Sequence, residues 1–203
     1  MNISVIIPVY NASEFLGKAV DSALQFEEVK EILLVEDKST DNSLEVCQKL
    51  ILKDSRIQLY QHPDKGNHGA GATRNLGLEK AGCEFISFLD ADDYYLPNRF
   101  DAEKEAFKEP KTEGVFGAIG VEYLSEKGRK EFQDKFKEVS LTTVNFPAEG
   151  ETVLKGLLGL TSQVFGTFFH LNTLTLRKSV LVKNNLHFNE NLRVHQDSDF
   201  IIK

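Results

Sequence analysis

The chain has 203 residues, of which 41% are hydrophobic and 27% are charged, and these proportions exclude a disordered or low-complexity chain. Its net charge of -7 lacks the excess of Lys and Arg that contact with a phosphate backbone requires, so we expect no nucleic-acid partner. Its two cysteines, Cys47 and Cys83, are far apart and form no CxxC pair, which indicates small buried side chains in a reducing compartment.

The chain begins with a short apolar run that is not a targeting segment. The run has no basic residue ahead of it and is interrupted by Pro8, so it does not resemble a signal peptide. No later stretch approaches the roughly 18 continuous apolar residues of a membrane span. We therefore expect a soluble, cytoplasmic protein.

The first half of the chain alternates apolar strands with amphipathic helices. Residues 3–9 are largely β-branched and apolar, which predicts a strand buried on both faces. Asn11 and Glu14 form a pair typical of a capping box, ahead of apolar residues at helical spacing over 15–24. The same alternation predicts strands at 32–35, 56–60 and 85–89 and helices at 43–52 and 70–81. This order is typical of an α/β fold with a mostly parallel sheet, right-handed crossovers and helices on both faces.

The second half of the chain is less regular. A helix is expected at 97–108, strands at 114–123 and 168–176, and a further helix from residue 199. The charged stretch 125–138 indicates a solvated helix or a mobile loop, with a docking surface as the alternative. Phe165, Phe168 and Phe169 are expected in the core. Because the last helix has barely begun at residue 203, we expect the chain to be truncated there.

Polar clusters follow each of the predicted parallel strands. They occupy residues 8–11, 36–41, 65–69 and 90–93. Ligands of open α/β sheets bind beyond the carboxyl ends of the strands, and these ends meet along one edge of a parallel sheet. We therefore expect the four loops to converge on one site.

Asp90 and Asp92 stand two positions apart at the end of the predicted strand 85–89. Such carboxylates are hard oxygen ligands for Mg²⁺ or Mn²⁺, which keeps its other positions for water and substrate phosphates. The alternative is a turn or a helix cap, since Asp is common in loops. Together with Asp93 these carboxylates would repel one another without a cation, which favours the metal interpretation.

Five motifs in this order make the chain resemble the family 2 glycosyltransferases, which have the GT-A fold. The motifs are VIIPVYN at 5–11, EILLVEDKSTD at 31–41, NHGAGATRNLG at 67–77, FLDADD at 88–93 and QDSDF at 196–200. Glu36 and Lys38 depart from the family, which often has Asp and Gly there. The resemblance implies a single GT-A domain, Rossmann-like, with a nucleotide-sugar-binding half at 1–124 and an acceptor-side half at 125–203.

The resemblance implies that the first four motifs bind a nucleotide-diphosphate sugar, with a UDP-sugar as the expected donor. Asp37 can accept a hydrogen bond from the N3–H of uracil, whereas capping of the next helix is assigned to Thr40 or Asp41. Arg74 has two open interpretations, a contact to the base or diphosphate and an ion pair with Glu79 or Asp92. The expected donor-binding residues are Pro8, Val9, Tyr10, Asn11, Asp37, Asn67, Arg74, Asp90, Ala91 and Asp92, and the expected ligands of Mn²⁺ or Mg²⁺ are Asp92 and Asp90.

The fifth motif implies a catalytic base. Asp197 matches the Asp of the family's Glu-Asp motif, which deprotonates the acceptor hydroxyl, although Gln196 stands in place of the Glu. Its structural alternative is the N-cap of the last helix. The implied reaction is metal-dependent, inverting transfer of a hexose to a hydroxyl of a glycan or lipid-linked acceptor, in the synthesis of a bacterial surface polysaccharide.

Other function classes fit the sequence less well. A sugar nucleotidyltransferase would need a Gly-rich basic loop after the first strand, and residues 8–11 do not form one. The Gln-x-x-Arg-Trp motif of processive synthases is excluded because the chain has no Trp. A catalytically silent nucleotide-sugar-binding module stays open as the alternative, as does peripheral membrane contact through residues beyond 203.

Overall fold

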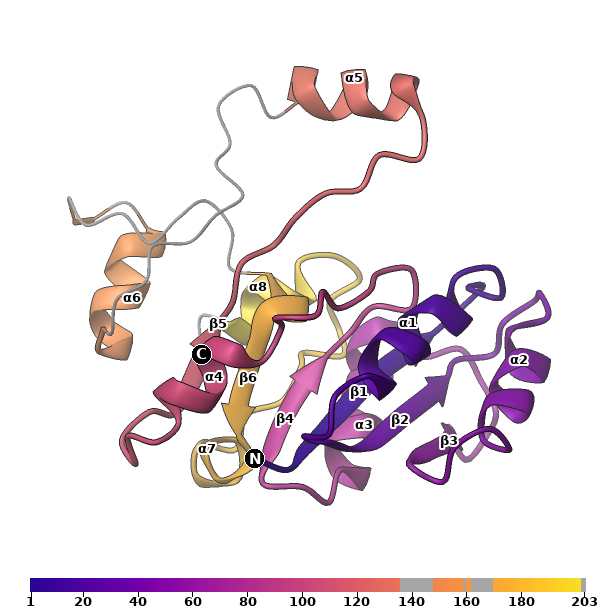
Figure 1. The fold of residues 1–203 in the computed structure, drawn as a ribbon, viewed down its shortest axis with the longest axis horizontal. Helices are drawn as coiled ribbons and strands as arrows, with labels where there is room; N and C mark the ends of the chain where they lie inside the picture. Colours follow the sequence, from indigo (N-terminus) through magenta and orange to yellow (C-terminus); the bar gives the residue numbers. More distant parts are fainter. Residues whose placement is uncertain (136–147, 159, 162–169, 202–203) are drawn as a thin grey trace. The chain divides into compact units, whose positions relative to one another are not determined.

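The computed structural model describes residues 1–135, 148–158, 160–161 and 170–201, which belong to two units (Figure 1). One unit comprises Met1–Val115 together with Leu171–Lys203, and the other comprises Phe116–His170. The expected halves, 1–124 and 125–203, differ from this division. The difference arises because the chain returns to the first unit at residue 171 and adds a strand to its sheet.

A six-stranded sheet forms the centre of the first unit, in the order β3-β2-β1-β4-β6-β5. Its strands are β1 (Ile3–Val9), β2 (Val29–Glu36), β3 (Ile57–Gln61), β4 (Phe85–Phe88), β5 (Gly114–Phe116) and β6 (Leu174–Arg177). β1 pairs in parallel with β2 and β4, and β2 pairs in parallel with β3. β4 pairs with β6 in the antiparallel direction. The prediction of a mostly parallel α/β sheet is confirmed.

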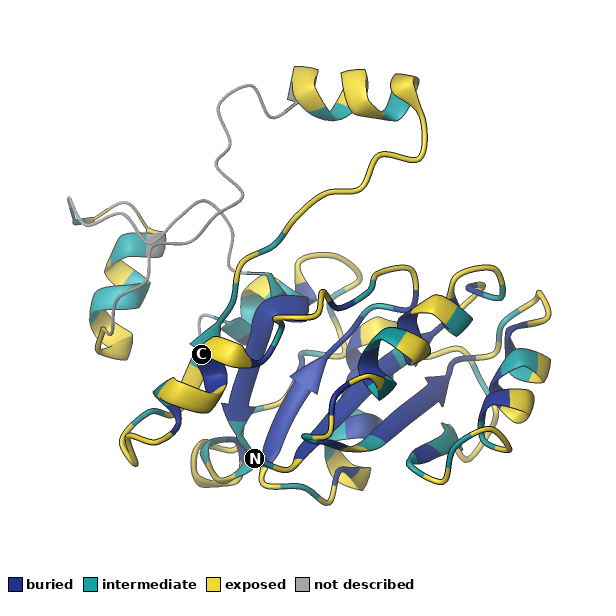
Figure 2. Cartoon of the chain, viewed as in Figure 1, coloured by how far each residue is buried: buried dark blue, intermediate teal, exposed yellow. Residues whose placement is uncertain are grey.

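Side chains of β1 alternate between two buried layers, one on each face of the sheet. Val5 lies in one apolar cluster with Leu16 of α1 (Leu16–Leu24) and Cys47 of α2 (Ser43–Leu50). Ile6 lies against Gly77 of α3 (Ala70–Lys80) on the other face. Figure 2 shows the central strands as the buried layer of this unit. Helices therefore cover both faces, as the alternating pattern predicts.

The start of α1 differs from the prediction. The residue before the helix is Phe15, and no side chain caps the helix. Asn11 does not form a capping box, because its Oδ1 accepts hydrogen bonds from the backbone N and Oγ1 of Thr40 at 2.8 and 3.2 Å. The expected capping box is therefore wrong, and Asn11 joins the loops that follow β1 and β2.

Elements after β4 are shorter than predicted. α4 covers only Asp101–Ala106, because hydrogen bonds between residues three apart replace the helical pattern on both sides of it and Pro110 follows. β5 has three residues, and most of 117–124 is exposed. A 3₁₀ turn (Leu171–Thr173) precedes β6, and Phe165, Phe168 and Phe169 lie outside the described residues. α7 (Lys178–Asn184) was not predicted, and α8 covers Gln196–Ile201.

The second unit contains two described helices, α5 (Glu126–Lys135) and α6 (Gly150–Leu157). The charged stretch was expected to be a solvated helix or a mobile loop, and α5 is a solvated helix. Nζ of Lys127 lies 3.8 Å from Oε1 of Glu131 on its surface. α6 was not predicted. None of the helices in the described ranges is both long enough and apolar enough to cross a membrane.

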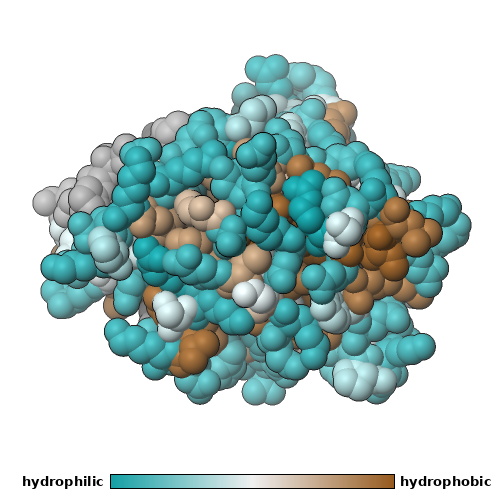
Figure 3. All heavy atoms as spheres, turned by 60° about the horizontal axis from the view of Figure 1, so that its bottom comes forward, coloured by the Kyte–Doolittle hydropathy of each residue, from teal (hydrophilic) through white to brown (hydrophobic). Residues whose placement is uncertain are grey.

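The two cysteines differ in solvent exposure. Cys47 is fully buried, and burial raises the pKa of its thiol to about 12. Cys83 is only half-buried, so the prediction of two buried thiols holds for Cys47 alone. The molecular face in Figure 3 is mainly hydrophilic, with apolar residues gathered in separate groups, as expected of a chain with 27% charged residues.

Gly77→Ala is expected to lower the free energy of unfolding by about 1–3 kcal/mol, because overpacking forces neighbouring atoms to move. A Cβ at residue 77 would stand 2.4 Å from Cγ2 of Ile6, so α3 could no longer pack as closely on β1. Urea denaturation followed by circular dichroism measures the change.

Gly17→Ala in α1 is the matched control, because a Cβ there would have no atom of another described element within 4 Å. This substitution is expected to be neutral or to stabilise the protein by up to about 1 kcal/mol. Equal losses of stability in the two variants would contradict the close contact between α3 and β1.

Candidate functional site

A cavity of about 420 Å³ opens where the four predicted loops meet. All of the expected donor-binding residues line it, from Pro8 of the first loop to Asp92 of the fourth. The sequence analysis missed five further lining residues, which are Ala12, Phe15, Gly69, Ala70 and Thr73. The convergence of the loops is thus observed, whereas the role of each residue stays a prediction.

Asp37 holds the loop that leads into α3. Its carboxylate, on a residue that is 2% exposed, accepts hydrogen bonds from the backbone N of His68 at 2.7 Å and of Gly69 at 2.8 Å, and from Nδ2 of Asn67 at 3.0 Å. Both carboxylate oxygens are therefore engaged within the protein. Any contact from Asp37 to a nucleobase would add to these bonds, and that contact stays a prediction.

Asp41 supports the start of α2. Its Oδ1 accepts hydrogen bonds from Oγ and N of Ser43 at 2.6 and 2.9 Å, and its Oδ2 accepts one from the backbone N of Ser13 at 3.1 Å. These bonds hold the pKa of the Asp41 carboxyl well below its usual range, and the bond from the Ser43 hydroxyl contributes most. The N-cap of α2 is Asn42, and its side chain forms no capping bond. The expected cap at Thr40 or Asp41 is therefore wrong: Asp41 supports the first residue of the helix from outside it, and Thr40 binds Asn11.

Arg74 forms an ion pair, but with a partner that was not expected. Its Nη2 donates to Oδ1 of Asp90 at 2.7 Å, whereas Glu79 pairs with the lysine that follows it. The guanidinium also lies 5.6 Å from the ring centre of Phe188. Nε of Arg74 is buried, and it has no hydrogen-bond partner in the described part of the chain. Arg74 therefore has one donor without a partner among the described residues, and part of its charge is offset by Asp90.

Two of the three carboxylates after β4 have partners within the protein. Asp90 is paired with Arg74, and Asp93 accepts a hydrogen bond from Nδ2 of Asn172, whose Oδ1 accepts one from the backbone N of Asp90 at 3.0 Å. Asp92 is exposed and has no such partner among the described residues. Only Arg74 brings a positive charge, because the amide of Asn172 is neutral, so the expected repulsion is reduced at Asp90 and a cation at Asp92 stays a prediction.

Asp92 and Asp90 are the groups at the cavity that could hold a metal ion. The described ranges contain no group of three or more His, Cys, Asp or Glu side chains arranged to bind one. Two carboxylates suit Mg²⁺ or Mn²⁺, because these hard cations bind one or two carboxylates and complete their coordination with water and substrate phosphates. The residues present thus fit such a cation only when a phosphate-bearing ligand is also bound.

Residues 188–200 form a second segment that is fixed against α3. Asn75 of α3 donates from Nδ2 to the carbonyl oxygen of Phe188 at 2.9 Å and accepts from its backbone N at 2.8 Å. The rings of Phe188 and Phe200 stack with centres 4.1 Å apart, and both meet Phe88 of β4 edge to face. Both ends of the segment are therefore anchored to the first unit.

Asp197 lies in the first turn of α8 and is half-buried. It does not line the cavity, but the element that carries it packs on the start of α3: a Cβ at Gly71, in the first turn of α3, would stand 3.2 Å from Oε1 of Gln196. Gln196 is 8% exposed, and its Nε2 donates to the carbonyl oxygen of Leu192 at 2.5 Å. A glutamate could not donate this bond, which gives a physical reason for glutamine at position 196.

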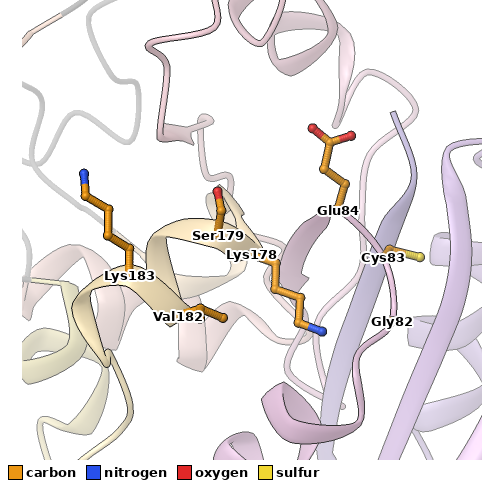
Figure 4. A pocket seen from close by; sticks show the side chains of 7 residues that line it. All are labelled: Gly82, Cys83, Glu84, Lys178, Ser179, Val182 and Lys183. Atoms are coloured by element: carbon orange, nitrogen blue, oxygen red, sulfur yellow. The ribbon is translucent and has the colours of Figure 1, made fainter.

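A second hollow, of about 650 Å³, lies at the amino end of β4. In Figure 4 the ammonium groups of Lys178 and Lys183, which line it, point in opposite directions. Nζ of Lys178 donates to the carbonyl oxygen of Ala81 at 2.6 Å. The polar groups of this second hollow do not converge on a common point, so the cavity at the carboxyl ends of the strands is the better candidate site.

A mostly parallel α/β sheet with a polar cavity at the carboxyl ends of its strands defines the class of open α/β proteins that bind ligands at this edge. The sequence profile described as Glycosyl transferase family 2 matches residues 4–166. The chain belongs to this family.

Individual relatives are similar to parts or all of the chain. An uncharacterised glycosyltransferase of Haemophilus influenzae is 41% identical over 102 residues, which are 50% of this chain and 40% of that protein. The minor teichoic acid biosynthesis protein GgaA of Bacillus subtilis is 27% identical over 97% of this chain and 42% of its own length. The crystal structure of S. aureus TarS 1-349 matches with a TM-score of 0.70 at 24% identity, over 99% of this chain and 54% of that one. The chain thus spans about half the length of these proteins, or less.

Asp37→Ala is expected to lower the free energy of unfolding by about 1–3 kcal/mol, because it removes the buried acceptor of three hydrogen bonds from residues 67–69. Urea denaturation at neutral pH measures this change.

Asp64→Ala is the matched control in the same loop. Asp64 accepts from the backbone N of Gly66 and lies 2.9 Å from Nε2 of His68, but its side chain is 65% exposed. Its removal is expected to change stability by less than about 1 kcal/mol. A loss in Asp37→Ala no larger than in this control would show that Asp37 does not hold the loop.

Proposed function

We propose that this chain is the donor-binding part of an inverting glycosyltransferase that moves a sugar, a hexose, from a UDP-sugar to a hydroxyl acceptor. The observation that carries the proposal is the cavity, where residues from four loops that are distant in sequence line one space. The proposed acceptor is a glycan or a lipid-linked precursor in the synthesis of a bacterial surface polysaccharide.

The relatives support a nucleotide-sugar donor and a divalent cation. TarS has been crystallised with UDP and with UDP-GlcNAc, and the mannosyltransferase PcManGT of Pyrobaculum calidifontis with GDP-Man and Mn²⁺. GgaA is a protein of teichoic acid biosynthesis, which supports a cell-surface polymer as the acceptor. We extend these properties to this chain as part of the proposal.

Exposed aromatic groups support binding of the nucleobase at the first loop. Tyr10 is 52% exposed and Phe15 is 40% exposed, and both line the cavity. Flat rings of this kind bind the faces of nucleobases, and such stacking is worth about 1–3 kcal/mol per base. The guanidinium of Arg74, whose Nε has no partner among the described residues, lies at the same cavity.

Asp92, with Asp90 beside it, is the group that would hold Mn²⁺ or Mg²⁺, and a cation there would offset the charge of the departing diphosphate. Asp90 contributes less directly, because Arg74 already binds one of its oxygens. We therefore assign Asp92 as the direct ligand and Asp90 as a group that orients Arg74 and bound water or ribose.

Asp197 is the proposed general base. Its carboxylate takes the proton of the acceptor hydroxyl while the hydroxyl oxygen forms a bond to the anomeric carbon. The bond from that carbon to the diphosphate oxygen breaks at the same time, with its electron pair leaving on the diphosphate, so the configuration inverts. A positioned base accelerates such a step about 10²–10⁴-fold.

A catalytically silent nucleotide-sugar-binding module is the second candidate function. It is favoured by Gln196, which replaces the acidic residue that the family has before the base. The two candidates differ in turnover, since the silent module would bind the donor and transfer nothing.

Asp92→Ala is expected to abolish the dependence of UDP affinity on Mn²⁺, because the direct ligand of the cation is lost. Calorimetric titration of UDP, with Mn²⁺ and with a chelator, measures this dependence in both proteins. Asp101→Asn removes the same charge from a side chain that is 70% exposed at the start of α4, and is expected to change nothing. If the unaltered protein binds neither UDP nor GDP with Mn²⁺, the proposed function is wrong.

Asp197→Asn is expected to lower kcat for sugar transfer by at least about 10²-fold, while UDP affinity stays within a few-fold. The substitution keeps the shape of the side chain and its place in the first turn of α8 but removes its ability to take a proton. Release of UDP from UDP-GlcNAc in the presence of acceptor measures the rate. Asp199→Asn in the same helix is the control, and a rate loss confined to that variant would move the base to Asp199.

A further inference from the structure

Arg193 lies at the border of the cavity, although neither the motifs nor the cavity-lining residues include it. A Cβ at Gly69, which does line the cavity, would stand 3.0 Å from Nη1 of Arg193. Gly69 has a φ of +84°, so glycine suits this position both for its backbone conformation and for the close approach of the guanidinium. The guanidinium of Arg193 therefore lies against the backbone where α3 begins.

The loop that carries Arg193 is fixed on both sides. Before it, Phe188 is bound by Asn75 of α3. After it, Gln196 packs on Gly71 and ties back to the carbonyl oxygen of Leu192. Arg193 thus belongs to an anchored loop, even though its own side chain is exposed.

The guanidinium of Arg193 is not paired with any of the described residues. Within the described part of the chain it has no hydrogen-bond or ion-pair partner, whereas the other arginine at the cavity, Arg74, is paired with Asp90. The neighbouring end of α3 offers first-turn backbone N–H groups without an intrahelical partner, because this helix of 11 residues has no acidic residue in its first turn and no side-chain cap. The carboxylate of Asp37 binds the amide of Gly69, just before these groups. The free guanidinium of Arg193 thus lies against Gly69 at the start of α3, and Gly69 and Arg74 line the same cavity.

We propose that Arg193 binds a phosphate of the donor's diphosphate, together with the first-turn amides of α3; this inference rests on the proposed function. The guanidinium presents a planar fork of N–H groups that matches two phosphate oxygens. Helix N-termini bind phosphate through free backbone N–H groups. Arg193 is then a donor-binding residue that recognises the diphosphate and not the nucleobase.

Calorimetric titration with uridine, UMP and UDP in the presence of Mn²⁺ tests this assignment. Arg193→Gln is expected to weaken UDP binding at least about tenfold and to leave uridine binding within twofold. Arg193→Lys, which keeps the charge but loses the fork, is expected to give an intermediate UDP affinity. Lys183→Gln removes a positive charge from a side chain that is 73% exposed on α7, away from the cavity, and is expected to leave every affinity unchanged.

The outcomes separate this inference from the proposed function. If the unaltered protein binds UDP and Arg193→Gln binds it equally strongly, the inference about Arg193 is wrong but the proposed function is not. Equal losses for uridine and UDP also overturn it, because Arg193 would then support the loop or the base. No UDP binding by the unaltered protein contradicts the proposed function and the inference with it. Thermal unfolding of each variant shows whether the exposed substitution leaves the fold intact.

Discussion

The hydrogen bonds to the buried carboxylate of Asp37 are the interaction on which the site depends. Parallel strands bring their carboxyl ends to one edge, but they do not fix the loops that follow. Asp37, at the end of β2, accepts from the backbone of His68 and Gly69 and thereby sets where α3 begins. Arg74, one turn further along α3, then reaches Asp90 beyond β4. One carboxylate on the second strand thus determines how the third and fourth loops meet.

The part of the fold that depends on local pattern was predictable. β1 was predicted at its observed bounds, because an uninterrupted β-branched run between polar residues has one strong interpretation. The local sequence pattern gave wrong predictions where a side chain forms its hydrogen bonds with a segment that is distant in sequence. Asn11 has the position of a helix cap, but Thr40, which lies 29 residues away, binds it instead. The expected repulsion of the aspartates after β4 is reduced for the same reason, because Arg74 and Asn172 reach two of them from other elements.

The candidate site was predictable as a set of loops, but not as a set of contacts. Motifs at strand ends identified the residues of the cavity, since the topology requires these ends to meet. The pairing of Arg74 with Asp90 was not predictable, because nearby carboxylates in the sequence were equally reasonable partners. The backbone conformation of Lys38 was not predictable from its residue type. Its φ of 58° is left-handed, and the family often has glycine at this position. Arg193 left no sequence signal, because its place depends on contacts between segments more than 100 residues apart, such as the 113-residue separation of Asn75 and Phe188.

α3 joins these features through the close approach of its glycines to other elements. Gly77 admits Ile6 of the sheet, Gly71 admits Gln196 of α8, and Gly69 admits the guanidinium of Arg193. A larger side chain at any of these positions would push away a different neighbour, since packed interiors transmit changes of a single methyl group. The helix can therefore carry few apolar residues and still be held between the sheet and the segment that bears Asp197. The geometry between the donor cavity and the proposed base thus depends on small residues of one helix, in addition to the charged residues that would do the chemistry.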